Sequence, residues 1–418
     1  MGSPAGRRRV VITGMGAVTP LGNSVAEYWD SLKNGRSGAG PITLFDTTDF
    51  ATKIAAEVKD FDPTAHIDRK MSRRMDRFCM FAVSATAMAM EDAGLSDLSG
   101  IDVNRVGVVV GSGIGGMTTF ESNHTALVEE GPRRISPLFI PMMIADISPG
   151  YISIIHGLKG PNYATTSACA TASHAIGDAC RIIERGDADI MISGGSEASV
   201  TAMGVGGFNA MRALSTRNDE PERASRPFDK DRDGFVNGEG SGIVVLESLE
   251  HALQRNARIL AEIGGLGFTA DAYHLTAPAP DGDGAMRAMQ TAIADAGLQP
   301  EDVDYVNAHG TSTGLGDIAE TLAIKRALGD HAQHVYISST KSMTGHLLGA
   351  AGGIELIATA LAVQHGIIPP TINLETPDPE CDLNYTPNTA VEKPVRNALS
   401  NTFGFGGHNA SILVKQYS

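Results

Sequence analysis

Short runs of β-branched residues that alternate with longer helical stretches constrain this fold most strongly. Because the runs are continuously apolar, each is expected to be a strand buried on both faces, in a sheet covered by helices. Such an alternation predicts an α/β protein. The predicted strands are RRVVITGMG, RVGVVVGSG, ADIMISGGSE, GIVVLES, VDYVNAHG, HVYISST and ASILVKQ. The predicted helices are Ser72–Ala93, Ala170–Gly186, Gly284–Ala296, Asp317–Leu328 and Ala350–His365.

Length and charge narrow the class of protein. A chain of 418 residues has room for two or three structural units. We expect a boundary within Glu250–Arg258, which divides the chain into residues 1–257 and residues 258–418. The net charge of −15 argues against a nucleic-acid binder, which needs a basic surface to face phosphates.

The four cysteines are too few for a disulfide scaffold. No CxxC pair occurs, which also argues against a thiolate zinc site. A reducing, cytoplasmic compartment fits this cysteine usage best.

Two segments mimic targeting or membrane sequences. The run after Arg9 is interrupted by Gly14, Gly16 and Pro20, so we interpret it as a buried strand rather than a signal peptide, with residues 1–6 as a leader outside the fold. The apolar stretch 354–363 is too short to span a bilayer. No membrane insertion is therefore expected.

Two ligand-binding motifs are present only in part. GSGIGG, residues 111–116, fits a dinucleotide fingerprint, but no strand precedes the acidic residues that follow it. DKDRDG, residues 229–234, begins like a calcium loop, but Gly240 stands where the bidentate glutamate belongs. Both segments are expected to be turns.

A basic run stands out in this acidic chain, and it contains Arg69, Lys70, Arg73, Arg74 and Arg77. Such runs are usually solvated faces. An acidic partner is the alternative, because a basic surface would steer and dock it.

Cys169 lies in YATTSACATASHAIGDAC, at the expected beginning of a helix. Free amide groups and the helix dipole at that position would lower the pKa of the thiol and favour the nucleophilic thiolate. Cysteine is also among the most buried residue types, so an inert core residue is the alternative.

Two histidines favour a catalytic role for Cys169 over an inert one. His309 and His346 each follow a predicted strand and lie next to glycines, and Lys341 precedes His346 by five residues. Near the C-terminus, NTFGFGGHNA has paired glycines that would expose backbone amides. These are the parts that acyl transfer between thioesters needs: a thiolate nucleophile, amides for the oxyanion and neutral imidazoles for an enolate. The Lys341 charge would keep the imidazoles neutral.

The motifs SACATASHAIGDA, AHGTSTGLGD, KSMTGHLLGAAGGIE and SNTFGFGG resemble those of the β-ketoacyl-acyl carrier protein synthases, the condensing enzymes of fatty-acid synthesis. The similarity covers essentially the whole chain. It is greatest to the elongating type II enzymes, which have isoleucine at the position of Ile114. The resemblance implies a thiolase-like fold of two similar α/β halves in five layers (αβαβα), and a homodimer.

The resemblance also implies roles for individual residues. Cys169 would carry the acyl chain, and His309 and His346, organised by Lys341, would assist decarboxylation of malonyl-acyl carrier protein. The amides of Cys169 and Phe405 would form the oxyanion hole, with Phe405 also acting as a gate.

Binding roles follow from the same resemblance. Ile114 would line the acyl pocket, and Thr311 and Thr313 would bind the pantetheine arm. The acyl carrier protein is acidic, so it would dock on Lys70, Arg73 and Arg74. No cofactor is expected for the reaction. Some relatives bind a structural monovalent cation, Na⁺ or K⁺, at positions that match Asn307, Glu355, Ser400 and Asn401.

Several related functions are weighed against this one. The intact Cys169 argues against a non-catalytic chain-length factor, and the lack of a second cysteine in FGFGGHN argues against a thiolase. Chalcone-type synthases pair cysteine with histidine and asparagine, whereas His346 stands here. A cysteine hydrolase would leave the second histidine without a role. A polyketide condensing enzyme uses the same residues and remains open.

Overall fold

The computed structural model describes residues 7–417, so the expected leader at residues 1–6 lies outside the described residues. The strands of the main sheet are β1 (Val10–Val18), β4 (Val106–Gly111), β5 (Asn162–Tyr163), β6 (Ile190–Glu197), β7 (Gly240–Ser248), β8 (Ala261–Ala270), β9 (Tyr305–Asn307), β10 (Tyr336–Ser338), β13 (Asn397–Gly404) and β14 (His408–Lys415). Two small sheets pair β2 (Gly40–Pro41) with β3 (Ile54–Ala55), and β11 (Ile367–Ile368) with β12 (Val391–Glu392).

Thirteen α-helices are found among the described residues. They are α1 (Val25–Lys33), α2 (Arg69–Ser72), α3 (Arg77–Asp92), α4 (Met117–Glu130), α5 (Phe139–Met143), α6 (Ile147–His156), α7 (Thr171–Arg185), α8 (Ala202–Ala210), α9 (Leu249–Gln254), α10 (Asp283–Asp295), α11 (Gly314–Leu328), α12 (Lys341–Thr344) and α13 (Ala351–His365). Within residues 7–417, none of these helices combines the length and the apolar character needed to cross a membrane.

The main sheet consists of two halves with the same topology. Its strand order is β10-β9-β13-β14-β8-β1-β7-β6-β4-β5. Outward from the centre, each half has two antiparallel pairings followed by two parallel ones. Among residues 7–417, strands of the two halves pair with each other only where Val10–Ile12 lie beside Ala261–Ile263. The expected boundary between residues 257 and 258 falls in the connection from α9 to β8.

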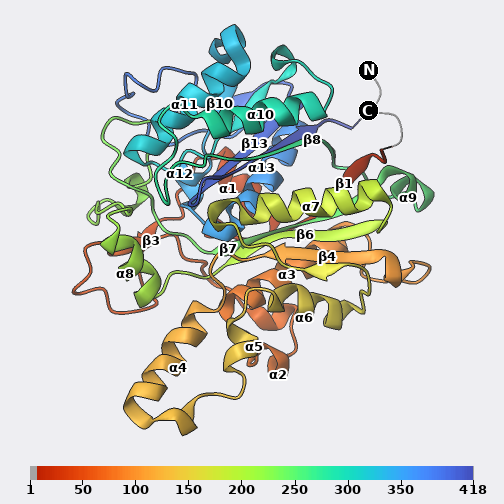
Figure 1. Ribbon diagram of the computed structural model, residues 1–418, viewed down its shortest axis with the longest axis vertical. Coiled ribbons are helices and arrows are strands. Elements are labelled where there is room, and N and C mark those ends of the chain that lie inside the picture. Colours follow the sequence, from red (N-terminus) through yellow and green to blue (C-terminus); the bar gives the residue numbers. More distant parts are fainter. Residues whose placement is uncertain (1–6, 418) are drawn as a thin grey trace.

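Helices α7 and α13 lie between the two halves of the sheet (Figure 1). Helix α7 packs on β6 and β4 of one half and on β14 of the other, while α13 packs on β7 and β13. Helices α3 and α6 cover the outer face of the first half, and α10 and α11 cover that of the second (Figure 1). The result is the five-layered, thiolase-like αβαβα arrangement that the resemblance implied.

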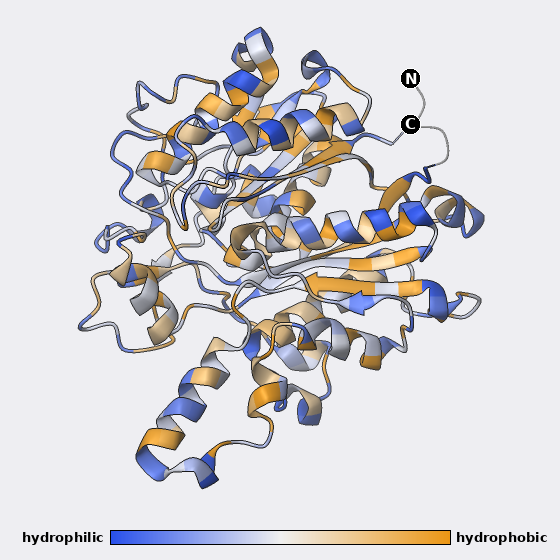
Figure 2. Cartoon of the chain, viewed as in Figure 1, coloured by the Kyte–Doolittle hydropathy of each residue, from blue (hydrophilic) through white to orange (hydrophobic). Residues whose placement is uncertain are grey.

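The central position of α13 explains its sequence. Residues 351–363 are all buried, as expected for a helix with protein on every side. The helix lies directly against the backbone of β7, since a Cβ on Gly242 would come within 2.4 Å of the Ile354 nitrogen. In Figure 2 the hydrophobic colour runs along much of β4 and β6, whereas α4, which projects from the body, alternates in colour.

All seven predicted strands and all five predicted helices are present. The prediction missed β8 and β13, because glycines and polar residues interrupt their apolar pattern. The helix predicted over 72–93 is two helices. Asp76 ends the intervening turn, and its side chain accepts a hydrogen bond from the Phe78 amide at the start of α3.

Candidate active site

Cys169 lies in a strained turn at the N-terminus of α7. A short 3₁₀ turn, Ala168–Ala170, leads into that helix, and Ala168 has a φ of 50°. An alanine in the left-handed region costs free energy, which the surrounding structure must offset. The side chain is nearly buried, with 7% of the residue exposed, yet it lines a cavity.

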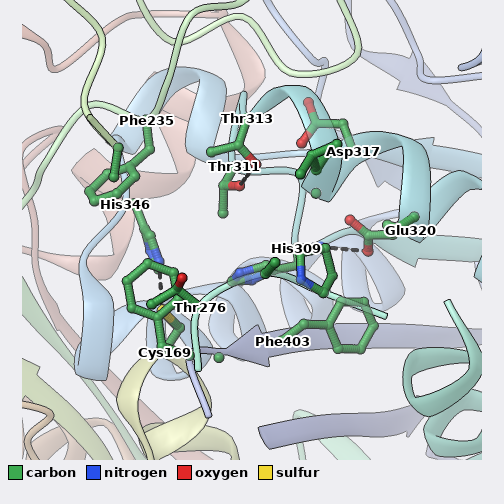
Figure 3. Close-up of a pocket in the computed structure, with 18 of the residues that line it drawn as sticks. Cys169, Phe235, Thr276, His309, Thr311, Thr313, Asp317, Glu320, His346 and Phe403 are labelled. Atoms are coloured by element: carbon green, nitrogen blue, oxygen red, sulfur yellow. Dashed lines mark hydrogen bonds between the residues drawn. The ribbon is translucent and has the colours of Figure 1, made fainter. Parts of the chain in front are cut away.

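The two predicted histidines flank this sulfur (Figure 3). The Nε2 atom of His346 lies 3.0 Å from Cys169 Sγ. The His346 Nδ1 atom accepts a hydrogen bond from the Leu348 amide, so the ring proton is assigned to Nε2, which donates to the sulfur. The His309 ring lies 5.3 Å from the His346 ring, centroid to centroid. The Cys169 Sγ atom and one ring nitrogen each of His309 and His346 all lie within 4.8 Å of one another.

Both imidazoles are held neutral. Burial is the main reason that the pKa values of His309 and His346 lie well below 6.5, and the Lys341 charge lowers them further. Lys341 therefore acts in the predicted direction, as the smaller of the two effects. Its ammonium forms a buried ion pair with Glu355, and each of these residues is about 1% exposed.

The expected low pKa of Cys169 is wrong for the free enzyme. Burial raises the pKa of the thiol to about 11. Lys341 and a hydrogen bond from the Phe405 amide act in the opposite direction, but burial outweighs both. The sulfur therefore rests as a thiol, and the His346 and Phe405 donors gain strength when negative charge develops on it.

The Phe405 loop reaches Cys169 through a glycine. A Cβ on Gly404 would lie 3.0 Å from the Cys169 nitrogen, so the two backbones are in close contact. This contact brings the amides of Cys169 and Phe405 to the same corner of the cavity, where both were predicted to bind an oxyanion. The Phe405 side chain is partly exposed and lines the cavity.

The cavity has a volume of about 670 Å³ and a mainly apolar wall. Ile114, Thr311 and Thr313, the predicted substrate-binding residues, all line it. The hydroxyl oxygens of the two threonines are 3.0 Å apart. The cavity also includes Phe208, Phe235, Leu348, Phe403 and Leu315 in its wall.

Two buried carboxylates, Glu197 and Glu320, were missed by the sequence analysis, and Glu355 was predicted only as a cation ligand. Glu320 accepts hydrogen bonds from the amides of His309 and Gly310, and so fixes the backbone at His309. Glu355 pairs with Lys341. Glu197, at the end of β6, binds amides of two loops that line the cavity. The one signal in the sequence that could have identified these glutamates is that each lies in a strand or helix whose other residues are mostly apolar.

The four candidate cation ligands divide between two faces of β13. Asn307 lies opposite Ser400 in the sheet, and its amide donates to the Glu355 carbonyl. The Asn307 Oδ1, Ser400 Oγ and Glu355 Oε2 atoms are buried without a hydrogen-bond partner among the described residues, while Glu355 Oε1 contacts the Lys341 ammonium. Such oxygens fit a monovalent cation. The Asn401 side chain lies on the opposite face, because successive side chains of a strand alternate, and there it contacts Ser411 and Met289.

The predicted docking residues lie on the surface. Lys70 belongs to α2, and Arg73 and Arg74 to the turn before α3, and all three are exposed. Within residues 7–417 they form no salt bridge. Arg77, in contrast, pairs with the buried Glu239 and has a structural role.

A cysteine, two neutral imidazoles and the amides of the predicted oxyanion site lie beside an apolar cavity on this fold, an arrangement that fits a condensing acyltransferase. The N-terminal domain of beta-ketoacyl synthase matches residues 7–252, and its C-terminal domain matches residues 260–375. The chain therefore belongs to the beta-ketoacyl synthase family.

Curated relatives resemble the chain along its whole length. The 3-oxoacyl-[acyl-carrier-protein] synthase 2 of a Synechocystis species is 55% identical over 98% of this chain and 99% of the relative. The protein of the same name from Staphylococcus aureus N315 is 54% identical, with the same coverage. Among solved structures, the ishigamide ketosynthase/chain length factor has a TM-score of 0.92 and 38% identity, over 99% of this chain and all of that one. A ketosynthase bound to its type II polyketide acyl carrier protein has a TM-score of 0.91 and 36% identity, with the same coverage.

Proposed function

We propose that this protein is a type II β-ketoacyl-acyl carrier protein synthase that elongates fatty acids. The observation that carries the proposal is the cluster of Cys169, His309 and His346 at the wall of an apolar cavity. The name shared by relatives more than half identical to the chain supports the substrate class.

In the first half-reaction, the Cys169 thiol attacks the thioester carbonyl of an acyl carrier protein. The oxyanion binds the amides of Cys169 and Phe405, and negative charge on the attacking sulfur is stabilised by the His346 donor and by Lys341. The carrier sulfur then leaves and takes the thiol proton. The acyl chain ends on Cys169, and its tail lies along the cavity past Ile114.

In the second half-reaction, malonyl-acyl carrier protein occupies the site. With the sulfur acylated, the Nε2–H of His346 is free to donate to the malonyl thioester carbonyl, beside His309. Loss of CO₂ leaves an electron pair as the enolate, which the neutral imidazoles stabilise. The enolate carbon attacks the Cys169 thioester, and the carbon–sulfur bond breaks. The Cys169 thiolate takes a proton from water, and β-ketoacyl-acyl carrier protein leaves.

The carrier protein is proposed to dock on Lys70, Arg73 and Arg74. These exposed cations have no acidic partner within residues 7–417, and acyl carrier protein is acidic. A homodimer is proposed at β5, the exposed final strand of the sheet, because an unpaired edge is a template for a second copy. No nucleic acid and no membrane insertion enter the proposal.

A structural Na⁺ or K⁺ ion is proposed at Asn307, Glu355 and Ser400. Its support is the set of partnerless oxygens on this face of β13. The ion would stabilise the Lys341–Glu355 region and would take no part in the chemistry. We further propose a cytoplasmic location, which fits a catalytic thiol and four cysteines that form no disulfide.

The deciding experiment is mass spectrometry of the intact protein after mixing with defined acyl carrier protein thioesters, followed by malonyl-acyl carrier protein. We expect one long acyl group on the peptide that contains Cys169, and its discharge as a product longer by two carbons. Repeated extension without release would indicate a polyketide enzyme instead. Hydrolysis without acylation of Cys169 would contradict both functions.

A further inference from the structure

The glycine-rich loop after β4 binds an anion that the protein itself supplies. This loop, Gly111–Gly116, fits a nucleotide fingerprint in the sequence, yet its amides are occupied by the carboxylate of Glu197. The amides of Gly113 and Ile114 donate to it at 2.9 and 3.3 Å, and the Ser112 hydroxyl donates at 2.9 Å. The loop therefore has a structural ligand in place of a phosphate.

The same carboxylate binds a second loop. The Gly349 amide, three residues after the catalytic His346, donates to Glu197 Oε2 at 3.0 Å. No side chain separates the two loops, because a Cβ on Gly349 would lie 2.3 Å from the Gly113 nitrogen. Glu197 thus ties the segment that carries Ile114 to the turn that carries His346.

We propose that Glu197 is a positioning residue that fixes the Ile114 wall of the acyl cavity against the His346 turn, and thereby sets which acyl chains the enzyme accepts. This inference rests on the proposed function. Glu197 does not touch the reacting atoms, and it acts through Ile114 and His346. Because Glu197 binds both segments, the Ile114 side of the cavity is fixed relative to Cys169 before a long acyl chain enters.

Both carboxylate oxygens of Glu197 are needed for this role, because each accepts hydrogen bonds from the loops. Oε1 accepts from Ser112 and Ile114, and Oε2 accepts from Gly113 and Gly349. An amide in place of the carboxylate would turn its N–H groups toward one of these pairs of donors. Two donors that face each other repel, so Glu197→Gln should part the two loops while keeping the side chain's volume.

The chain offers a matched control in Glu57. Its buried carboxylate accepts hydrogen bonds from the backbone amides of Thr43 and Leu44 and from the Thr43 hydroxyl. Glu57 does not line the cavity. Glu57→Gln therefore measures the cost of the same chemical change at a site remote from the substrate.

The experiment compares acylation of Cys169 by acetyl- and hexadecanoyl-acyl carrier protein in wild type, Glu197→Gln and Glu57→Gln, followed by intact mass. For Glu197→Gln we expect the ratio of long-chain to acetyl acylation rates to fall about tenfold, because acetyl presents only one methyl group to the wall. Glu57→Gln should keep the wild-type ratio, even with a similar loss in melting temperature.

An unchanged ratio in Glu197→Gln would overturn the inference, as would an equal change in both variants. If Glu197→Gln does not fold, Ser112→Ala, which removes one donor to the same carboxylate, should lower the ratio in the same direction, and an unchanged ratio there would overturn the inference too. A wild-type protein that neither thioester acylates would instead defeat the proposed function.

Discussion

His346 directs a ring N–H at the Cys169 sulfur from 3.0 Å, while its other ring nitrogen is occupied by the Leu348 amide. This hydrogen bond fixes the tautomer before any substrate arrives. His346 is therefore placed as a donor in both half-reactions, first to the sulfur and then to the malonyl carbonyl.

Replacing the nucleophile should abolish condensation. In Cys169→Ala no acyl-enzyme can form, so elongation should fall to background. Cys180→Ala is the control: Cys180 is buried in α7 beside Glu184 and does not line the cavity. Intact mass and product analysis test both variants. Elongation retained in Cys169→Ala would contradict the assignment.

The decarboxylation half-reaction should be insensitive to pH near the ordinary histidine pKa. Because the pKa values of His309 and His346 lie well below 6.5, both rings stay neutral as the pH falls from 8 to 6. The measurement is CO₂ release from labelled malonyl-acyl carrier protein across this range. A loss of rate centred near pH 6.5 would contradict this expectation.

Lys341→Ala should affect both stability and pH dependence. It removes the cation partner of the buried Glu355 carboxyl, and breaking a buried ion pair in this way typically costs about 3–5 kcal/mol of unfolding free energy. Loss of the nearby positive charge also raises the histidine pKa values, so the acidic limb of CO₂ release should move to higher pH.

Denaturant titration and the pH profile measure these two effects of Lys341→Ala separately. The double variant Lys341→Met, Glu355→Leu serves as the control, because it leaves no unpaired charge and should recover most of the stability while keeping the altered profile. An acidic limb that stays at its wild-type pH would show that Lys341 does not act on the imidazoles.

Charge reversal on the proposed docking surface should weaken recognition of the carrier protein. Arg73→Glu with Arg74→Glu should raise KM for acyl-acyl carrier protein about tenfold at low salt, and less at high salt because ions screen exposed charges. KM for a small acyl-pantetheine thioester should not change. Arg396→Glu reverses an exposed charge just before β13 and serves as the control. Equal effects on both substrates would argue against docking there.

A larger residue at position 114 should shorten the accepted acyl chain. Ile114→Phe adds a ring to the cavity wall and removes volume that the chain tail needs. Acylation rates across a series of chain lengths should peak at a shorter chain than in wild type. Ile114→Leu, of equal volume, should keep the wild-type optimum. An unchanged optimum in Ile114→Phe would exclude Ile114 from the chain's path.

The sequence predicted the fold class and the residues that meet at the cavity because both depend on local patterns. Apolar runs marked the strands, and small residues around Cys169 marked a helix start. The pattern failed at β8, where glycines allow a helix to approach the sheet closely, as at Gly267 beside the Ala288 carbonyl, and at β13, where polar residues interrupt the apolar run.

The energetics of the site could not be predicted in the same way. The pKa of Cys169 depends on burial by loops distant in sequence, and this outweighs the local helix effect. Glu197 and Glu320 find their amide donors only after the chain has folded. Three-dimensional contacts of this kind leave no periodic signal.

The turn before α7 has a counterpart before α13. Leu348, like Ala168, has a positive φ, 48°, at the first position of a 3₁₀ turn that leads into a central helix. The second position is Cys169 in one turn and Gly349 in the other. The same backbone turn thus occurs twice in the chain with two different uses. The first turn presents the Cys169 side chain. The second has no side chain at the matching position, Gly349, so the loop that contains Gly113 can lie directly against it.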